Sequence, residues 1–330
     1  MSGIHQQPQG RVWRNGVLTS KQIRLDDLPT LVQDPSTLVW IDLLQPGVEE
    51  LSTTASALGL PPSAVEEALG SHPRSRLARH DKYLFFTVFD ATMDSDTRER
   101  GRLRTRGLSG IVTRNAVVTI RRDPSWSTDA FTRHWDEDAD EISHGSAMLL
   151  YGILDSVADS HLAAIQELDD AIEELEDALF EDDRTPDGFQ QQLYGIRKDL
   201  VELRYVVIPM REIVNGLLLR SEEHTSMTPW FDDLYFRALR AAEWADSLRD
   251  MVSSLFETNL SLQDARLNSI MKKLSGWAAV IAVPTAITGW FGQNIPFWGF
   301  SQPVGLWLST ALILVAMIVL YVVFRQRDWL

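Results

Sequence analysis

Two amide side chains, Gln293 and Asn294, directly follow Gly292 in the least polar part of the chain. The run 274–324 that contains them holds no Asp, Glu, Lys, Arg or His. A polar amide inside a membrane segment is energetically expensive, and by default it marks a transport pathway or a packing contact. The elements on either side decide between these two interpretations.

Small residues precede the amides at helical spacing. Ala278, Ala282, Thr285, Gly289 and Gly292 follow one another at intervals of four, three, four and three, so they share one helix face. Such a stripe is typical of close packing between membrane helices. It also suits a narrow pore lined by several copies of this helix. From the stripe alone, both interpretations stay open.

The charge balance excludes some classes of function and favours others. The chain carries 46 acidic against 31 basic residues, a net charge of −15. Nucleic-acid partners are not expected, because phosphate binding needs basic patches. Many acidic chains are merely soluble, but beside a membrane hairpin the excess also suggests cations. No phosphate-binding loop and no nucleophile–base constellation occurs, so we expect neither an ATP-driven pump nor an enzyme.

The uncharged run is long enough for two membrane crossings, since one crossing needs about 20 apolar residues. Lys272 and Lys273 precede the first span, Arg325 and Arg327 follow the second, and the connecting turn is uncharged. The positive-inside rule then places both ends of the hairpin in the cytoplasm. The first 16 residues contain no signal-peptide core. We therefore expect a multi-pass protein of the inner or cell membrane, with both termini cytoplasmic.

The part before residue 146 alternates between strand-like and helix-like segments. Strand-like runs rich in Val, Phe, Thr and Ile lie at 11–18, 38–44, 83–91 and 111–121. Helix-like segments lie at 48–58 and near 63–69, and Arg114–Asn115 suits a hairpin turn. These signals predict a mixed α/β domain.

The rest of the chain reads as helical. An acidic amphipathic helix follows residue 146, and a second helix, at about 189–220, is expected to be interrupted by Pro209. Between Pro229 and Gly276 there is neither Gly nor Pro, so one long helix should run straight into the first span. A lone helix of that length would be unsupported, so it should bundle with other helices or with copies of itself.

The predicted fold class is an α+β cytoplasmic domain with a long helical stalk and two C-terminal transmembrane helices. The expected parts are a cytoplasmic α/β domain at 1–145, an acidic helical hairpin at 146–228 and a stalk helix at 229–273. They continue with a first transmembrane helix at 274–294, an extracytoplasmic loop at 295–303, a second transmembrane helix at 304–324 and a basic tail at 325–330.

Several of these segments together resemble the CorA family of divalent-cation transporters. PTAITGWFGQN, residues 284–294, is similar to the end of the family's first span, which closes on a Gly-x-Asn motif, most often Gly-Met-Asn. LNSIMKKL before the span resembles the family's Asn-x-x-Met-Lys-x-Leu junction. WIDLLQP at 40–46 and the basic tail FRQRDWL also fit. The resemblance covers most of the chain.

The resemblance implies a funnel-shaped homopentamer whose first spans line the pore and whose second spans face lipid. Gly292, Gln293 and Asn294 would form the selectivity filter at the outer mouth. Mg2+ gives up its water reluctantly, and a ring of Asn294 amides can hydrogen-bond that water shell without stripping it. Weak binding at several positions lets the ion leave again, as conduction requires.

The same resemblance assigns the pore below the filter. Met271 and Leu274 match the family's apolar constriction, which can gate by dewetting, and Thr285 can contact the hydrated ion. The implied pore and gate positions are Asn268, Met271, Leu274, Ala278, Ala282 and Thr285. A basic ring of Lys272, Lys273, Arg325 and Arg327 flanks the spans. A divalent cation entering a negative interior gains about 4.6 kcal/mol per 100 mV.

The resemblance also implies regulation, in which carboxylates at the subunit interfaces bind intracellular ion and hold the funnel closed. Asp233 matches such a site by its position on the stalk helix, and its partner should be Asp90, Asp94 or Asp96. Mg2+ would then be both the transported and the regulatory ion, with no organic cofactor. The expected partners are divalent metal ions, membrane lipid and other copies of this chain.

Two departures from the family pattern keep alternatives open. Gln293 stands where the family most often has Met, and the turn IPFWGFSQP lacks the acidic residue that many members place after the motif. A transporter of the zinc-carrying ZntB branch, or one for Co2+ or Ni2+, is the first alternative. Its weakness is that no His or Cys lies within the spans to bind zinc. The second is a membrane-anchored ion sensor or scaffold that does not conduct.

Overall fold

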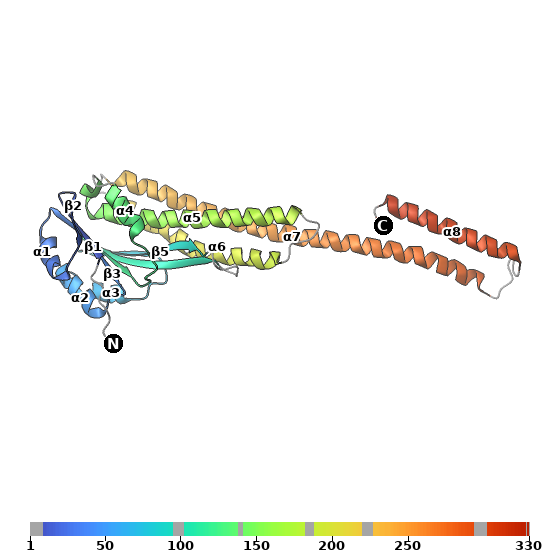
Figure 1. Ribbon diagram of the computed structural model, residues 1–330, viewed down its shortest axis with the longest axis horizontal. Helices are drawn as coiled ribbons and strands as arrows, with labels where there is room; N and C mark the ends of the chain where they lie inside the picture. The colour runs from blue at the N-terminus through green and yellow to red at the C-terminus, as the bar shows by residue number, and fades with distance from the viewer. Residues whose placement is uncertain are drawn as a thin grey trace. The chain divides into compact units, whose positions relative to one another are not determined.

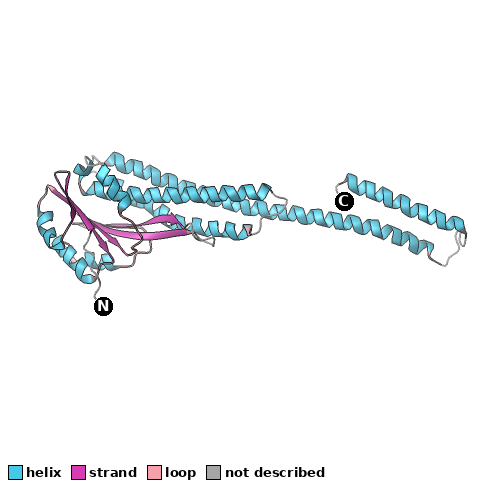
Figure 2. Ribbon diagram, in the orientation of Figure 1, coloured by secondary structure: helices cyan, strands magenta, loops and turns pink. Residues whose placement is uncertain are grey.

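The computed structural model describes residues 9–94, 102–137, 141–181, 188–219, 227–293, 302–327 and 329. These residues form two compact units, Met1–Ser253 and Ser254–Leu330. The first unit contains one sheet and the helices on its two faces, and the second contains helices only (Figures 1 and 2). The division falls within one long helix, which begins in the first unit and ends in the second.

One seven-stranded sheet, in the order β2-β1-β3-β7-β6-β5-β4, organises the first unit. Only β3 and β7 run parallel, and the other pairs are antiparallel. The strands are β1 (Gln9–Arg14), β2 (Val17–Gln22), β3 (Thr37–Leu44), β4 (Arg76–Arg79), β5 (Leu84–Met93), β6 (Leu103–Val112) and β7 (Ala116–Arg121).

The single strand expected at 11–18 was wrong, because a tight turn divides it. Asn15 and Gly16 both have positive φ, 48° and 80°, and they join β1 to β2 as a hairpin. Asn-Gly is favoured at such two-residue turns because both positions need left-handed backbone. The turn expected at Arg114–Asn115 does join β6 to β7.

Helices cover both faces of the sheet, which is why central strand β3 is buried along nearly its whole length. On one face lie α1 (Leu28–Gln33), α2 (Val48–Ala57) and α3 (Pro62–Leu69), where Leu28, Leu51 and Ala64 pack on Ile41 and Val118. These residues form a hydrophobic core between the three helices and this face of the sheet.

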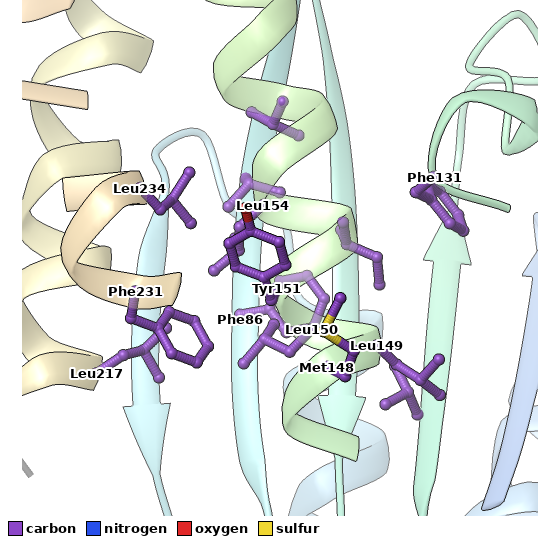
Figure 3. Packing of buried hydrophobic residues seen from close by; sticks show 14 of the residues in the cluster. Phe86, Phe131, Met148, Leu149, Leu150, Tyr151, Leu154, Leu217, Phe231 and Leu234 are labelled. Carbon is purple, nitrogen blue, oxygen red and sulfur yellow. The ribbon is translucent and has the colours of Figure 1, made fainter. Parts of the chain in front are cut away.

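The other face holds another hydrophobic core, to which α4 (Asp129–Glu137), α5 (Ser146–Glu181), α6 (Phe189–Leu218) and the start of α7 (Thr228–Phe291) contribute. Figure 3 shows Tyr151 and Leu154 of α5 among Phe86 of β5 and Phe231 and Leu234 of α7. The interruption expected at Pro209 was wrong, because α6 is continuous through it.

Asp42, the charged residue of the WIDLLQP segment, belongs to a buried hydrogen-bond network in this sheet. Asp42 of β3 accepts hydrogen bonds from Arg121 and Thr119 of β7, with Arg121 Nη2 at 2.5 Å from Asp42 Oδ2. The indole of Trp40 donates to Thr119 Oγ1 at 3.1 Å. A buried carboxylate needs such partners, so Asp42 holds the two parallel strands together.

Among the described residues, three helices are long and apolar enough to cross a membrane: α5, α7 and α8 (Pro303–Gln326). The most apolar 18-residue stretch of α5 is 67% buried inside the protein, so its apolar face is already used in the core. The corresponding stretches of α7 and α8 are only 11% and 0% buried. Their apolar surfaces must be covered by something other than this one chain.

Candidate functional site

The described part of the filter motif lies where α7 ends. Phe291 is the last helical residue, the Gly292 N–H donates to the Thr288 carbonyl at 2.8 Å, and the Gln293 N–H donates to the Trp290 carbonyl at 3.3 Å. Gly292 and Gln293 are exposed. Asn294 lies outside the described residues, so its amide stays a sequence-based assignment.

The small-residue face of α7 lies open on the single chain. Ala278, Ala282 and Thr285 are exposed, as the sequence interpretation requires of a pore or packing face. The Thr285 hydroxyl donates to the Ile281 carbonyl at 3.0 Å, so its remaining capacity is that of an acceptor. Because the water around a cation points its hydrogens outward, Thr285 can accept hydrogen bonds from a hydrated ion.

The expected constriction lies on the same helix, about three to four turns before Thr285. Met271 and Leu274 are 58% and 63% exposed, and Asn268 is also exposed. These three positions, with the small-residue face above them, share the part of α7 that this chain leaves uncovered. One chain presents a wall of this kind but does not enclose a pore.

The four basic residues flank the two apolar helices. Lys272, Lys273, Arg325 and Arg327 are all exposed, and Arg325 donates to the Tyr321 hydroxyl at 3.3 Å. From Lys273 to Phe291 the helix rises about 27 Å, and from Pro303 to Phe324 about 32 Å, each close to the thickness of a bilayer core. α8 extends to Gln326, so Arg325 lies in the last turn of the helix and Arg327 directly follows it.

The regulatory candidates lie on two different elements. Asp233 is exposed near the start of α7, whereas Asp90 lies in β5 and Asp94 directly after it. Asp96 lies outside the described residues. Within the part of the chain that the structure covers, no group of three or more His, Cys, Asp or Glu could hold a metal. A site made by Asp233 would need a ligand from a second chain or from an undescribed segment.

Asp90 already has a strong partner in its own sheet. Arg106, its register partner on β6, donates to the Asp90 carboxylate from Nη2 at 2.5 Å, from Nε at 3.2 Å and from its backbone N–H at 3.1 Å. Burial raises the pKa of Asp90 even though Arg106 opposes that shift. This arrangement favours a structural role, so Asp94, one third exposed and 3.7 Å from Arg104 Nη2, is the better placed of the two.

Sequence reasoning missed a charged cluster beside Asp233. Arg237, one turn further along α7, pairs with Asp155 and Asp159 of α5. Burial raises the pKa of Asp155. Burial also raises the pKa of the neighbouring Tyr151, and the negative charges of Asp155 and Asp233 raise it more. The spacing of Asp155 and Asp159 places both on one helix face, but only the packing of α5 against α7 shows their partner.

Comparison with known proteins gives consistent matches along nearly the whole chain. Residues 35–326 match the family described as CorA-like Mg2+ transporter protein. The cobalt/magnesium transport protein CorA of Thermotoga maritima is 26% identical over 313 residues, covering 90% of this chain and 85% of that protein. The protein of the same name from Methanocaldococcus jannaschii is 27% identical over 302 residues, covering 89% and 92%.

The fold has a close counterpart among solved structures. The complete structure of the CorA magnesium transporter from Methanocaldococcus jannaschii superposes with a TM-score of 0.76 at 24% identity. The match covers 99% of this chain and 100% of the other. The architecture of sheet, long helix and C-terminal apolar helices is therefore shared, whereas the pore chemistry has to be argued from this chain's own residues.

Proposed function

The chain belongs to the CorA-like Mg2+ transporter family, and we propose that it carries Mg2+ into the cell, driven by the membrane potential and gated by cytoplasmic Mg2+. The observation that carries the proposal is the exposed, uncharged face of α7 that ends at the Gly-Gln-Asn motif. A simple anchor needs neither the small-residue face nor the amides at its end.

Conduction requires several copies, because two helices do not surround a pore. The exposed apolar surface of α7 and α8 supports this arrangement, with α8 facing lipid and α7 facing its copies. We propose a homopentamer with two spans per chain and both termini in the cytoplasm. The similar rise of the two helices between Lys273 and Arg325 supports this topology, because it allows the basic residues at both ends of the hairpin to lie at one membrane face, as the positive-inside rule requires.

The filter would work by hydrogen bonding to a hydrated ion. Five Asn294 amides at the outer mouth would offer acceptors to the ion's water, with Gln293 and the Gly292 carbonyl adding more. Below them, Thr285 presents an acceptor and no free donor hydrogen, which suits the outward hydrogens of that water. Met271 and Leu274 would then form the dry constriction that closes when the cytoplasmic part holds Mg2+.

The filter assignment has a direct test in reconstituted vesicles. Asn294→Ala should lower Mg2+ influx at fixed voltage by at least tenfold, because each of five filter amides is lost. Gln302→Ala removes another amide at the outer end of the hairpin, at the N-cap of α8, and should leave influx unchanged. Equal influx in the natural protein and in Asn294→Ala would show that Asn294 is not part of the selectivity filter.

A further inference from the structure

The cations at the ends of the two apolar helices have no carboxylate partner. These four basic residues, all exposed, are Lys272 and Lys273 of α7 and Arg325 and Arg327 at the end of α8. Among the described residues, none of the four forms an ion pair with an acidic side chain. The stretch 265–327 holds no acidic residue, and Asp328 directly follows it. On a chain of net charge −15, this stretch is therefore positive.

The two lysines lie away from the expected pore wall. Successive residues of an α-helix are about 100° apart, so the middle of the wall made by Met271 and Leu274 lies about 130° around α7 from Lys272 on one side and from Lys273 on the other. A lysine lays its carbon stem along apolar surface and carries its charge to the nearest polar layer. The two lysines are therefore placed to meet groups outside the ion path.

The end of α8 combines its arginines with aromatic side chains. Arg325 donates to the Tyr321 hydroxyl at 3.3 Å, and the Trp329 indole stacks on the Phe324 ring with 5.5 Å between centroids. The Trp329 N–H donates to the Phe324 carbonyl at 2.9 Å, which turns the chain back onto the helix. Tyr and Trp gather at the level of lipid headgroups. A guanidinium carries five N–H donors, so the bond to Tyr321 orients Arg325 and leaves donors for an anion.

Both pairs of cations fit the depth of lipid phosphates. The rise from Lys273 to Phe291 is about 27 Å and that from Pro303 to Phe324 about 32 Å, so each apolar helix brings its cations to the edge of a bilayer core. Phospholipid phosphates lie just beyond that edge. Anionic lipid on the cytoplasmic side attracts basic residues that adjoin a membrane helix.

We propose that the four basic residues bind the phosphate groups of anionic phospholipid in the cytoplasmic leaflet. Arginine matches a phosphate with two parallel N–H donors, whereas lysine contributes a point charge. The occupant is a lipid rather than a soluble anion, because the apolar stretch of α8 that precedes the arginines is 0% buried and needs acyl chains as cover. The proposal rests on the membrane topology proposed above and adds the lipid that this end of the hairpin selects.

Lipid selectivity of the full-length protein tests the proposal without relying on transport. The protein would be placed in vesicles of phosphatidylcholine and phosphatidylglycerol, in which one lipid at a time carries brominated acyl chains that quench nearby tryptophans. Replacing Trp290, Trp298 and Trp307 with Phe leaves Trp277 and Trp329, beside the four basic residues, as the tryptophans of the hairpin. This protein should favour phosphatidylglycerol by about threefold or more, and raising the salt concentration should weaken the preference.

Neutral variants in the same background locate the preference. Lys272→Gln/Lys273→Gln and Arg325→Gln/Arg327→Gln should each reduce it, because two of the four charges are lost. Equal affinity for the two lipids before any charge is removed would overturn the proposal. A preference unchanged in both neutral variants would overturn it as well.

Two controls separate a lipid site from a general effect of charge or folding. Arg197→Gln/Lys198→Gln removes adjacent exposed cations from α6 in the first unit and should keep the preference. Lys272→Arg/Lys273→Arg keeps both charges and should keep most of it.

Influx of Mg2+ into the same vesicles keeps the transport proposal separate. If the neutral variants kept the lipid preference but shifted the internal Mg2+ concentration that half-inhibits influx, the cations would meet acidic groups of the protein, and the lipid proposal would fail. Influx that persists in phosphatidylcholine alone would support transport whatever the lipid result. Absence of influx in both kinds of vesicle would count against transport, while the quenching still reports on the lipid.

Discussion

At the scale of single residues, an acidic composition is a poor guide to metal sites. Asp90, chosen from the sequence as a possible ligand, is engaged by Arg106, and Asp155 by Arg237. Asp42 in the WIDLLQP segment bridges β3 and β7 through Arg121. These pairs join residues 16 to 82 positions apart, so they depend on strand register and helix packing, which the sequence pattern does not specify.

Exposed Asp233 is the residue for which a sensing role stays open. Asp233→Ala should raise the internal Mg2+ concentration that half-inhibits influx, because a ligand that favours the closed state is lost. Asp232→Ala removes the adjacent exposed carboxylate of α7 and should leave the inhibition curve in place. The measurement is influx into vesicles loaded with graded Mg2+, and coincident curves for all three proteins would dispose of the sensing role.

His161 of α5 makes the stability of the first unit depend on pH. It is fully buried and bonds the Phe89 carbonyl through Nε2 at 2.8 Å, and burial lowers its pKa to about 4. The unfolded chain has a histidine pKa of about 6.5 and therefore binds the proton first as pH falls. The contribution of His161 to the free energy of unfolding is therefore fully present above pH 6.5. It decreases by about 3 kcal/mol as the pH falls to 4.

The prediction for His161 is a difference between two proteins. His161→Gln lacks the titrating ring, so its urea midpoint, followed by tryptophan fluorescence in solubilised full-length protein, should depend less on pH between 6.5 and 4. All other titrating groups are present in both proteins, so their effects cancel in the difference between the two midpoint curves. Parallel midpoint curves would mean that His161 does not control acid stability.

At the scale of elements, the sequence predicts what periodicity and turn residues determine. The helices from residue 146 onward, the long unbroken helix and the two apolar helices are predicted because each carries a long uninterrupted pattern. The β1–β2 hairpin was missed because Asn15–Gly16, a pair favoured at two-residue hairpin turns, was included in one strand-like run. Pro209 does not break α6, since the neighbouring core positions Val206, Val207 and Met210 stay buried and hold the helix together.

Asp199 shows how an element is fixed by a residue outside any motif. This buried residue of α6 accepts hydrogen bonds from the backbone N–H groups of Arg102 and Leu103, at 3.0 and 3.2 Å, where β6 begins. Asp199→Ala would leave both donors without an acceptor and should lower the free energy of unfolding by about 2–4 kcal/mol. Lys198→Ala, its exposed neighbour, should change it by less than about 0.5 kcal/mol.

Hydrogen exchange provides the local check on Asp199. The Arg102 and Leu103 amides should exchange faster in Asp199→Ala, while those in the middle of β7 keep their protection. Unchanged exchange at both amides would show that another acceptor replaces the carboxylate.

At the scale of the whole molecule, the first unit is folded as a protein in water is, whereas the exposed apolar helices of the second unit suit a lipid bilayer. Among the described residues, the first unit buries most of its large apolar side chains, whereas the second unit leaves most of its own exposed. Apolar surface of this extent is covered in a functioning protein by lipid or by other protein chains. Composition alone predicts the apolar hairpin, but the number of copies and their contacts come from shape, which a single sequence pattern does not contain.

Ion flux into liposomes that contain the purified protein tests the central claim most directly. Mg2+ and Zn2+ would be compared at one negative interior potential, each with and without a proton gradient. We predict Mg2+ entry driven by voltage alone and blocked by Mg2+ inside. Zn2+ uptake that requires the proton gradient would contradict it in favour of zinc transport, and no flux of either ion would leave a membrane-anchored sensor.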